Sequence, residues 1–240
     1  MFLFGSFFGY PFWEKMAGTP SQRAALLQQD PAAALSHAAR LLEEPSGKSV
    51  AVISDACGIT AVALALLGAQ VTLFSVSEGN ERYATELAEA AEVRMPCVVC
   101  PPEEIDRNAY AGRFDAVIVD GAVLHFTQAL RPAVRSLHDI LKPGGQLISG
   151  VYPFDGNLAK IMLFSQPGLL NPDEADYMKA QIAGVGAMPL GLLHKQDQLA
   201  IITVGSDEFL DCKFRTAQEL GFDPSDETYD GANFILCTKA

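Results

Sequence analysis

Two polar residues near the end of an apolar run have the types needed for acid–base chemistry. Asp120 closes the run FDAVIVD, and His125 follows it within the segment GAVLHF. An imidazole titrates near neutral pH and suits a general base, while a carboxylate at a strand end can face a ligand. His125 has a simpler alternative, in which its ring caps the next helix or packs in the core. Tyr152 and Asp155, after the run QLISGVY, are further candidates for lining the same pocket.

The cysteines offer little support for a metal or redox centre. Cys97 and Cys100 form a C-x-x-C pair, but no second such pair and no nearby histidine follow it. On a strand, residues at i and i+3 face opposite sides of the sheet, and a structural zinc site needs four ligands. Cys57 is interpreted as a small residue of a loop. We expect no metal site.

Most of the chain after residue 48 alternates between apolar strands and helices. The sequence predicts helices over 58–67, 78–91 and 127–141. It predicts strands over 49–54, 70–76, 96–100, 114–120, 146–152 and 233–239. This alternation is typical of right-handed βαβ crossovers around a buried parallel sheet. We also expect a tight KPGG turn over 142–145 and a helix over 207–220 that ends at Gly221.

The rhythm is interrupted at two places, which divide the chain. Residues 1–47 are predicted to form an aromatic arm and helices that start at Thr19-Pro20 and Asp30-Pro31, because Thr or Asp before Pro is a helix start signal. Residues 48–240 form the α/β domain, with a mostly helical cap inserted at about 155–205. Residues 198–204 fit a helix or a strand equally well.

The aromatic arm has several possible locations. Residues 1–13 hold seven of the 21 aromatic residues of the chain. The arm packs on its own domain, covers an apolar ligand pocket, or docks on a second chain, because an aromatic surface of this size rarely stays in water. Gly and Pro interrupt it, and it is too short to span a membrane.

Charge excludes some functions. The net charge of the 240 residues is −12, from 17 Lys and Arg against 29 Asp and Glu. A chain that binds nucleic acid or an anionic membrane needs clustered cations instead. Five cysteines, an odd number, suggest no disulfide framework, and with no signal peptide a cytoplasmic location is expected.

Three segments, in order, resemble the class I S-adenosylmethionine-dependent methyltransferases. They are DACGITAVALALLGAQVTLFSVSE, FDAVIVDGAVLHF and LHDILKPGGQLISG. The segment TAQELGF resembles the helix before the closing antiparallel hairpin of that family. The resemblance implies a Rossmann-like α/β fold, with a seven-stranded, mostly parallel sheet and helices on both faces. It also implies that S-adenosylmethionine lies across the carboxyl ends of strands 1, 2 and 4.

The first cofactor motif departs from the family pattern. The resemblance implies an acid at the end of strand 1, which binds the ammonium group of the cofactor, followed by a glycine-rich loop. Aligned on the retained Gly58, the acid falls at Ser54 and the first glycine at Ala56. Asp55 is acidic but one residue out of phase, so its side chain would face the other way on a strand. Asp120 at the end of strand 4 is a further cofactor-binding candidate.

The ribose and adenine positions depart in the same way. The family acid that binds the ribose hydroxyls falls at Ser75, next to Val76, and the nearest carboxylate is Glu78. The acid near adenine falls at Pro101, beside Pro102. A hydrogen bond to a charged group contributes about 1.5–3 kcal/mol, so losing two costs about 3–6 kcal/mol. Cofactor affinity would then fall by about 10²–10⁴.

Two hypotheses follow for the function. In the first, the protein is a methyltransferase that acts on a small, apolar metabolite held under the cap and the aromatic arm. In the second, it is a catalytically degenerate, methyltransferase-like subunit that supports a partner enzyme. In that case the arm mediates a homo- or hetero-oligomer. The absence of a G-x-G-x-x-G motif after strand 1 argues against a nicotinamide dehydrogenase.

Overall fold

The computed structural model describes most of the predicted α/β domain. The described residues are 9–54, 56–121, 123–151, 198–199, 209–223 and 233–240. Residues 1–8 of the arm, Asp55, Tyr152, Asp155 and nearly all of the predicted cap at 155–205 lie outside them. Of the ambiguous segment 198–204, only Gln198 and Leu199 are described, and they are helical.

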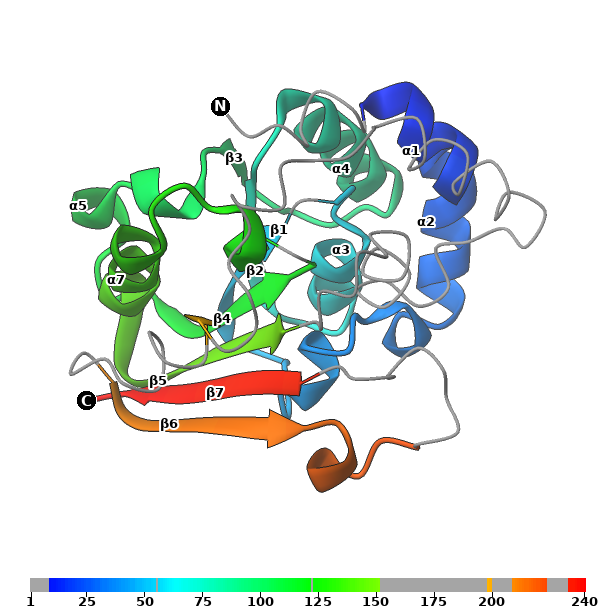
Figure 1. Cartoon of the computed structure of the whole chain (residues 1–240). Helices are drawn as coiled ribbons and strands as arrows, with labels where there is room; N and C mark the ends of the chain where they lie inside the picture. Colours follow the sequence, from blue (N-terminus) through cyan, green and yellow to red (C-terminus); the bar gives the residue numbers. More distant parts are fainter. Residues whose placement is uncertain (1–8, 55, 122, 152–197, 200–208, 224–232) are drawn as a thin grey trace, which may run out of the picture.

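A mixed seven-stranded sheet forms the centre of the described structure, in the order β3-β2-β1-β4-β5-β7-β6 (Figure 1). Strands β1 to β5 pair in parallel, whereas β7 pairs antiparallel with both β5 and β6. The strands are β1 (Ser49–Ser54), β2 (Gln70–Ser75), β3 (Cys97–Val99), β4 (Phe114–Asp120), β5 (Leu141–Val151), β6 (Phe209–Thr216) and β7 (Asn233–Lys239). The predicted fold class is confirmed.

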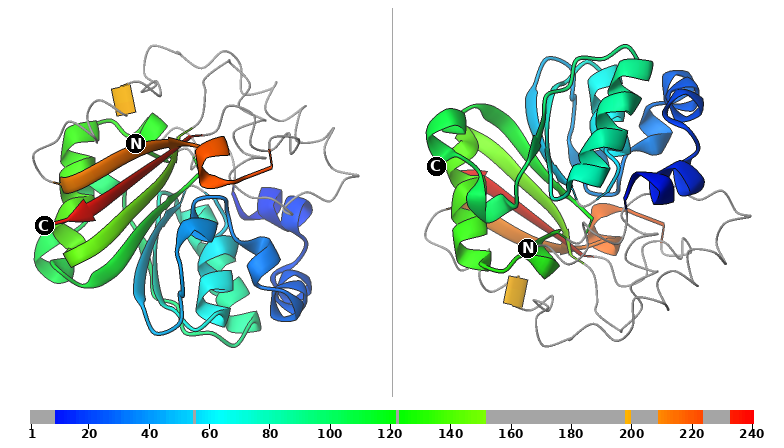
Figure 2. Two further views of the ribbon diagram at one scale, coloured as in Figure 1. Left: turned by 90° about the horizontal axis from the view of Figure 1, so that it is seen from below. Right: turned by 90° about the horizontal axis from the view of Figure 1, so that it is seen from above.

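Helices cover both faces of the sheet (Figure 2). They are α1 (Tyr10–Ala17), α2 (Pro20–Gln29), α3 (Ile59–Leu66), α4 (Glu78–Ala90), α5 (Arg107–Tyr110), α6 (Val123–Phe126) and α7 (Leu130–Ile140). Alternate residues of β1 feed two separate cores: Val50 and Val52 pack with α1 to α4, while Ala51 and Ile53 pack with α6 and α7. This two-sided burial explains why β1 is apolar throughout.

The N-terminal helices are partly as predicted. Helix α2 begins with a capping box, in which the Thr19 and Gln22 side chains bind each other's backbone N–H groups. The helix predicted after Asp30-Pro31 is wrong, because the structure has only two 3-10 turns there, η1 (Ala32–Ala34) and η2 (Ala39–Leu41). Between them the buried Ser36 N–H donates to Thr60 Oγ1 at 3.2 Å, a tertiary contact that replaces a helical hydrogen bond.

The described part of the aromatic arm packs on its own domain. Trp13 in α1 is buried, and its Nε1–H donates to Asn80 Oδ1 of α4 at 2.7 Å. The Tyr10 hydroxyl donates to Glu86, also on α4. A Cβ built on Gly79 would lie 3.0 Å from the Gly9 Cα, so the two helices touch at backbone level. For residues 9–17, the expectation of packing on the same chain is confirmed.

The C-terminal region departs from the prediction. The helix expected over 207–220 is wrong: residues 209–216 form strand β6, and the 3-10 turn η6 (Gln218–Leu220) follows it. Cys212 and Phe214 alternate with charged residues, a period-2 pattern that fits the edge strand beside β7. The TAQELGF segment therefore lies between β6 and β7 and not before the hairpin.

The pairing of β6 with β7 also corrects the expectation of no disulfide. The antiparallel register sets Cys212 opposite Cys237, with their Cα atoms 4.0 Å apart, and the two form a disulfide. The pairing was missed because residues 207–220 were predicted as a helix. Only the strand register of β6 beside β7 brings the two cysteines together. Cys57, Cys97 and Cys100 are free.

Smaller differences concern the start of α7 and the KPGG turn. Helix α7 begins at Leu130 and not near residue 127, because Glu103 accepts hydrogen bonds from Thr127 Oγ1 and the Gln128 N–H. The KPGG residues lie within β5, where the register with β4 shifts between Leu141 and Gln146. None of the described helices is long and apolar enough to cross a membrane.

Candidate functional site

A row of buried polar side chains crosses the carboxyl ends of three neighbouring strands. Ser54 at the end of β1 is in register with Ser75 of β2 on one side and with Asp120 of β4 on the other. In-register residues of parallel strands face the same side of a sheet. None of the three side chains is more than 1 % exposed. The structure thus brings three of the predicted cofactor-binding residues into one row.

The loop after β1 is organised by its own hydrogen bonds. The Ser54 Oγ accepts from the Ala56 N–H at 3.1 Å, and the Ser54 carbonyl accepts from the Val76 N–H at 3.3 Å. Ala56 and Val76 are both buried. The Ser54 hydroxyl therefore helps to shape the loop after β1.

Gly58 begins α3 in a position that only glycine fits. Its φ is +78°, and a Cβ built on it would lie 2.6 Å from the Ala84 Cβ and 3.0 Å from a Leu73 methyl carbon. The glycine therefore lets α3 approach α4 and β2 closely. Its presence is explained by packing within the chain, whatever ligand lies nearby.

The polar side chains at the end of β2 form hydrogen bonds within the turn that leads to α4. The Ser75 Oγ donates to the Ser77 carbonyl at 2.9 Å, and the Ser77 Oγ accepts from the Asn80 N–H as the N-cap of α4. Glu78 follows in the first turn of α4 and is exposed. The Ser77 cap was missed in the sequence, although a Ser before an acidic first turn is a recognisable start signal.

The carboxylate nearest the predicted adenine position has another partner. Pro101 caps the 3-10 turn η3 (Pro102–Glu104), and Pro102 is buried. Glu103 then accepts from Thr127 Oγ1 at 2.6 Å, which ties η3 to the segment before α7. No local sequence signal indicates this pairing, because the two residues are 24 positions apart.

Asp120 and His125 are both buried, at 1 % exposure each. His125 lies in the short helix α6, which follows β4 directly and contacts it. Burial raises the pKa of the nearby Cys57 thiol to about 12, and the Asp120 charge adds to that shift. The catalytic assignments of Asp120 and His125 stay predictions.

The free cysteines behave as packing residues. Cys97 packs with the core under α4 and Cys100 with the core on the other face, as expected for i and i+3 on a strand. Burial raises the pKa of Cys97 to about 12 and of Cys100 to about 11, so both stay protonated thiols at neutral pH. Within the described ranges, no group of three or more potential ligands could hold a metal ion.

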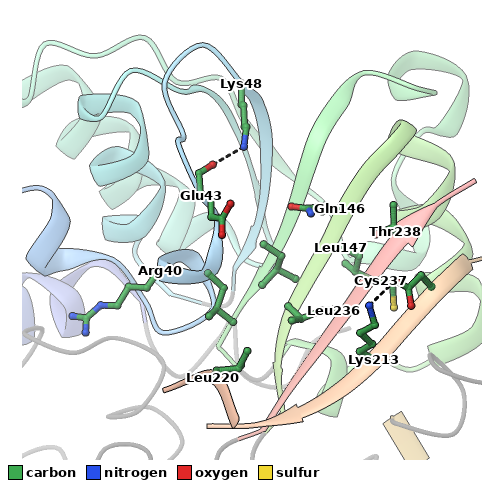
Figure 3. A pocket seen from close by; sticks show the side chains of 13 residues that line it. Arg40, Glu43, Lys48, Gln146, Leu147, Lys213, Leu220, Leu236, Cys237 and Thr238 are labelled. Carbon is green, nitrogen blue, oxygen red and sulfur yellow. Dashed lines mark hydrogen bonds and ion pairs between the residues drawn. The ribbon is translucent and has the colours of Figure 1, made fainter. Parts of the chain in front are cut away.

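A separate groove of about 650 Å³ lies away from this row (Figure 3). Arg40, Glu43 and Lys48 line it before β1, and Lys213 and Leu236 line it from the hairpin. Its two lysines are engaged within the chain: Lys48 donates to the Glu43 carbonyl, and Lys213 pairs with Asp211. None of the residues of the polar row lines it.

The residues of the row fit one half of S-adenosylmethionine better than the other. The buried Asp120 carboxylate suits the ammonium group of the methionine part, since a buried charge is favoured by an opposite charge. At the ribose half, the Ser75 hydroxyl is engaged with Ser77, and Glu78 is the carboxylate on the adjacent turn. The donor set therefore fits the amino-acid half, and the carboxylate nearest the ribose half is the exposed Glu78.

Comparisons with known proteins agree with this fold. Residues 55–149 match a family model described as a methyltransferase domain. A search of curated protein sequences finds no match. Among solved structures, a putative S-adenosylmethionine-dependent methyltransferase from Methanococcus maripaludis superposes with a TM-score of 0.59 at 14 % identity, covering 97 % of this chain and 94 % of the other.

Two further solved structures are similar over nearly their whole length. A methyltransferase from Thermotoga maritima, described as a possible histamine N-methyltransferase, has a TM-score of 0.54 at 16 % identity, covering 99 % of this chain and 100 % of the other. A putative methyltransferase from Haloferax volcanii, solved with the Trm112 methyltransferase activator, has a TM-score of 0.56 at 12 % identity, covering 95 % and 97 %. The strand order and these superpositions show the fold of the class I S-adenosylmethionine-dependent methyltransferases, and residues 55–149 are similar to the methyltransferase domain family.

Proposed function

We propose that the protein transfers a methyl group from S-adenosylmethionine to a small, apolar metabolite. The observation that carries the proposal is the buried row of Ser75, Ser54 and Asp120 at the carboxyl ends of β2, β1 and β4. In open α/β sheets, ligands bind at this edge, where the strand order changes direction. The family match over residues 55–149 spans these strand ends from the loop after β1 to β5.

In this proposal the chain contributes position more than chemical activation. The bound cofactor supplies an electrophilic methyl group on a sulfonium ion. The protein holds the acceptor in line with that methyl group, keeps out water, and takes up a proton where the acceptor carries one. His125, on the helix directly after β4, is the proposed proton acceptor.

The proposed apolar character of the substrate rests on the aromatic arm. Residues 1–13 carry seven of the 21 aromatic residues. The described part of the arm packs against α4, the helix that begins where β2 ends. Aromatic side chains beside an acceptor favour an uncharged compound over a highly polar one.

Calorimetry with S-adenosylmethionine, and analysis of what copurifies with the protein, test the cofactor part. We expect saturable binding of the cofactor or of its demethylated product in the micromolar to millimolar range. An absence of heat at millimolar cofactor, together with no copurified cofactor or product, would contradict the proposal. If binding is found, incubation with labelled cofactor and a panel of small acceptors tests transfer.

A second candidate function is a methyltransferase-like subunit that supports a partner enzyme. Two polar side chains near the predicted ribose and adenine positions favour it, because they bind other parts of the chain. Ser75 binds Ser77, and Glu103 binds Thr127. The similar Haloferax volcanii methyltransferase was solved with an activator protein, which illustrates such a pairing in that protein alone. In this chain the docking segment would be residues 1–8, because residues 9–17 pack on their own domain.

Light scattering and a methylation assay on the same sample separate the two functions. A purified chain that runs as a monomer and methylates an acceptor by itself excludes the supporting role. A chain that neither binds the cofactor nor transfers methyl groups, but forms a stable complex with another protein, favours it.

A further inference from the structure

The carboxylate of the polar row lies on β4, one strand away from β1, where the family carries an acid. Ser54 occupies the family's acidic position at the end of β1, and its in-register neighbour on β4 is Asp120. Neighbouring strands lie about 4.8 Å apart, and the paired residues face the same side of the sheet. The charge is thus close to where an acid on β1 would place it.

A second buried carboxylate at position 54 would be unfavourable beside Asp120. Two buried carboxylates on adjacent strands repel each other, so that one of them is forced to take up a proton. With Asp120 in place, a hydroxyl at position 54 avoids this repulsion, and the Ser54 Oγ is then used to accept the Ala56 N–H. A serine on β1 is therefore compatible with an acid on β4, and its presence does not by itself indicate a lost site.

Burial makes Asp120 suited to a cationic ligand group. The side chain is 1 % exposed, and its in-register neighbour on β1 is Ser54. Hydrogen bonds that involve a charged group contribute more than neutral ones, and they strengthen in a low-dielectric site. S-adenosylmethionine carries such a group, the ammonium of its methionine part.

We propose that the Asp120 carboxylate binds the ammonium group of S-adenosylmethionine, in place of the acid that the family carries at the position of Ser54. This inference rests on the proposed function, because it requires that the cofactor binds. It assigns to β4 a contact that the family makes from β1, and it explains how the chain can lack the first motif acid and still recognise the amino-acid half of the cofactor.

The test measures binding and not activity. S-adenosylhomocysteine carries the ammonium group, whereas 5′-methylthioadenosine has the same adenosine but lacks the amino-acid part. Titration calorimetry gives the affinity of the native protein for both. Asp120→Asn should weaken the binding of S-adenosylhomocysteine by about tenfold to a hundredfold. The affinity for 5′-methylthioadenosine should stay within about twofold of the native value.

A charge swap and a distant charge removal complete the design. The double variant Ser54→Asp with Asp120→Asn returns the acid to β1 and should recover at least part of the lost affinity. Glu43→Gln removes one exposed charge in the separate groove and should change neither affinity. Thermal melts of each variant show whether it is folded.

The outcomes separate the inference from the proposed function. A native protein that binds neither ligand contradicts the proposed function and the inference with it. A native protein that binds both ligands equally, or an Asp120→Asn variant that weakens both or neither, overturns the inference while cofactor binding stands. Selective loss for S-adenosylhomocysteine with recovery in the charge swap supports it. Equal affinity of the native protein for the two ligands overturns the inference even if Asp120→Asn does not fold.

Discussion

The ends of β4 and β2 lie at the same sheet edge but use their polar side chains differently. At the end of β4, Asp120 places a buried carboxylate beside Ser54. At the end of β2, the Ser75 hydroxyl donates to the Ser77 carbonyl, and Ser77 caps α4, so the polar atoms there serve the turn itself. Equivalent positions in one fold can therefore support a ligand or support the backbone, and sequence position alone does not distinguish the two.

The largest expected effect concerns the glycine between these two regions. Gly58→Ala should lower the free energy of unfolding by about 2–5 kcal/mol, from the left-handed backbone and the clash with Ala84. Urea denaturation measures the loss. Gly47→Ala is the control: its φ is also +78° but nothing lies within 4 Å, so about 1–2 kcal/mol is expected. Equal losses would show that close packing is not the reason for Gly58.

A second change tests the anchor behind the β2 end. Trp13→Phe removes the donor to the buried Asn80 Oδ1 and should cost about 1–3 kcal/mol of unfolding free energy. A double-mutant cycle with Asn80→Ala isolates the pair from the packing of the ring. Additive losses in the cycle would mean that this hydrogen bond does not hold α1 on α4.

A third change tests whether Glu78, next to the end of β2, contributes a carboxylate that binds the cofactor. If Glu78 reaches the ribose, Glu78→Ala should weaken cofactor binding by about tenfold, as expected for one hydrogen bond to a charged group. Glu89→Ala, exposed near the other end of α4, is the matched control. Unchanged affinity in Glu78→Ala would sharpen the contrast, because the β2 end would then contribute no acid.

The smallest expected effect on stability concerns Asp115, at the amino end of β4. Hydrogen bonds from Lys142 and the Ser49 N–H hold the pKa of Asp115 below its usual range. A carboxylate with a lowered pKa stabilises the fold above its unfolded pKa and loses this contribution as the pH falls. Asp115→Asn should cost less than about 1 kcal/mol at pH 7, since the pair is partly exposed, and the difference should shrink below about pH 4. Unfolding curves of both proteins between pH 3 and 7 test it; a constant difference contradicts the pairing.

The sequence predicts the parallel part of the fold well, because burial on both sides leaves a local signal. The apolar runs before Ser54, Ser75 and Asp120 each become a strand that ends at these residues. Edge strand β6 carries a weaker period-2 signal mixed with charges, and the prediction took it for a helix. The region around Ser36 was also predicted as helix. Its local sequence favours a helix, whereas the Ser36 contact with Thr60 that replaces it is set by tertiary structure.

The site divides in the same way. Ser54 and Ser75 could be named because the family resemblance aligns its motif positions with them, and Asp120 because it ends a predicted strand. The structure adds their shared face and register. What the sequence does not contain is the use of each side chain. Glu103 pairs with Thr127 and Ser75 pairs with Ser77, and such choices depend on distances that only the folded chain sets.

The order of the last two strands has a consequence for how the sheet is assembled. Strand β7 follows β6 in the chain but lies inside it in the sheet, between β5 and β6. Strand β6 is therefore joined to the sheet only through residues 233–239, which pair with β6 on one side and with β5 on the other. A truncation before residue 233 would remove one strand from the chain but two from the sheet, leaving β5 as the new and apolar edge.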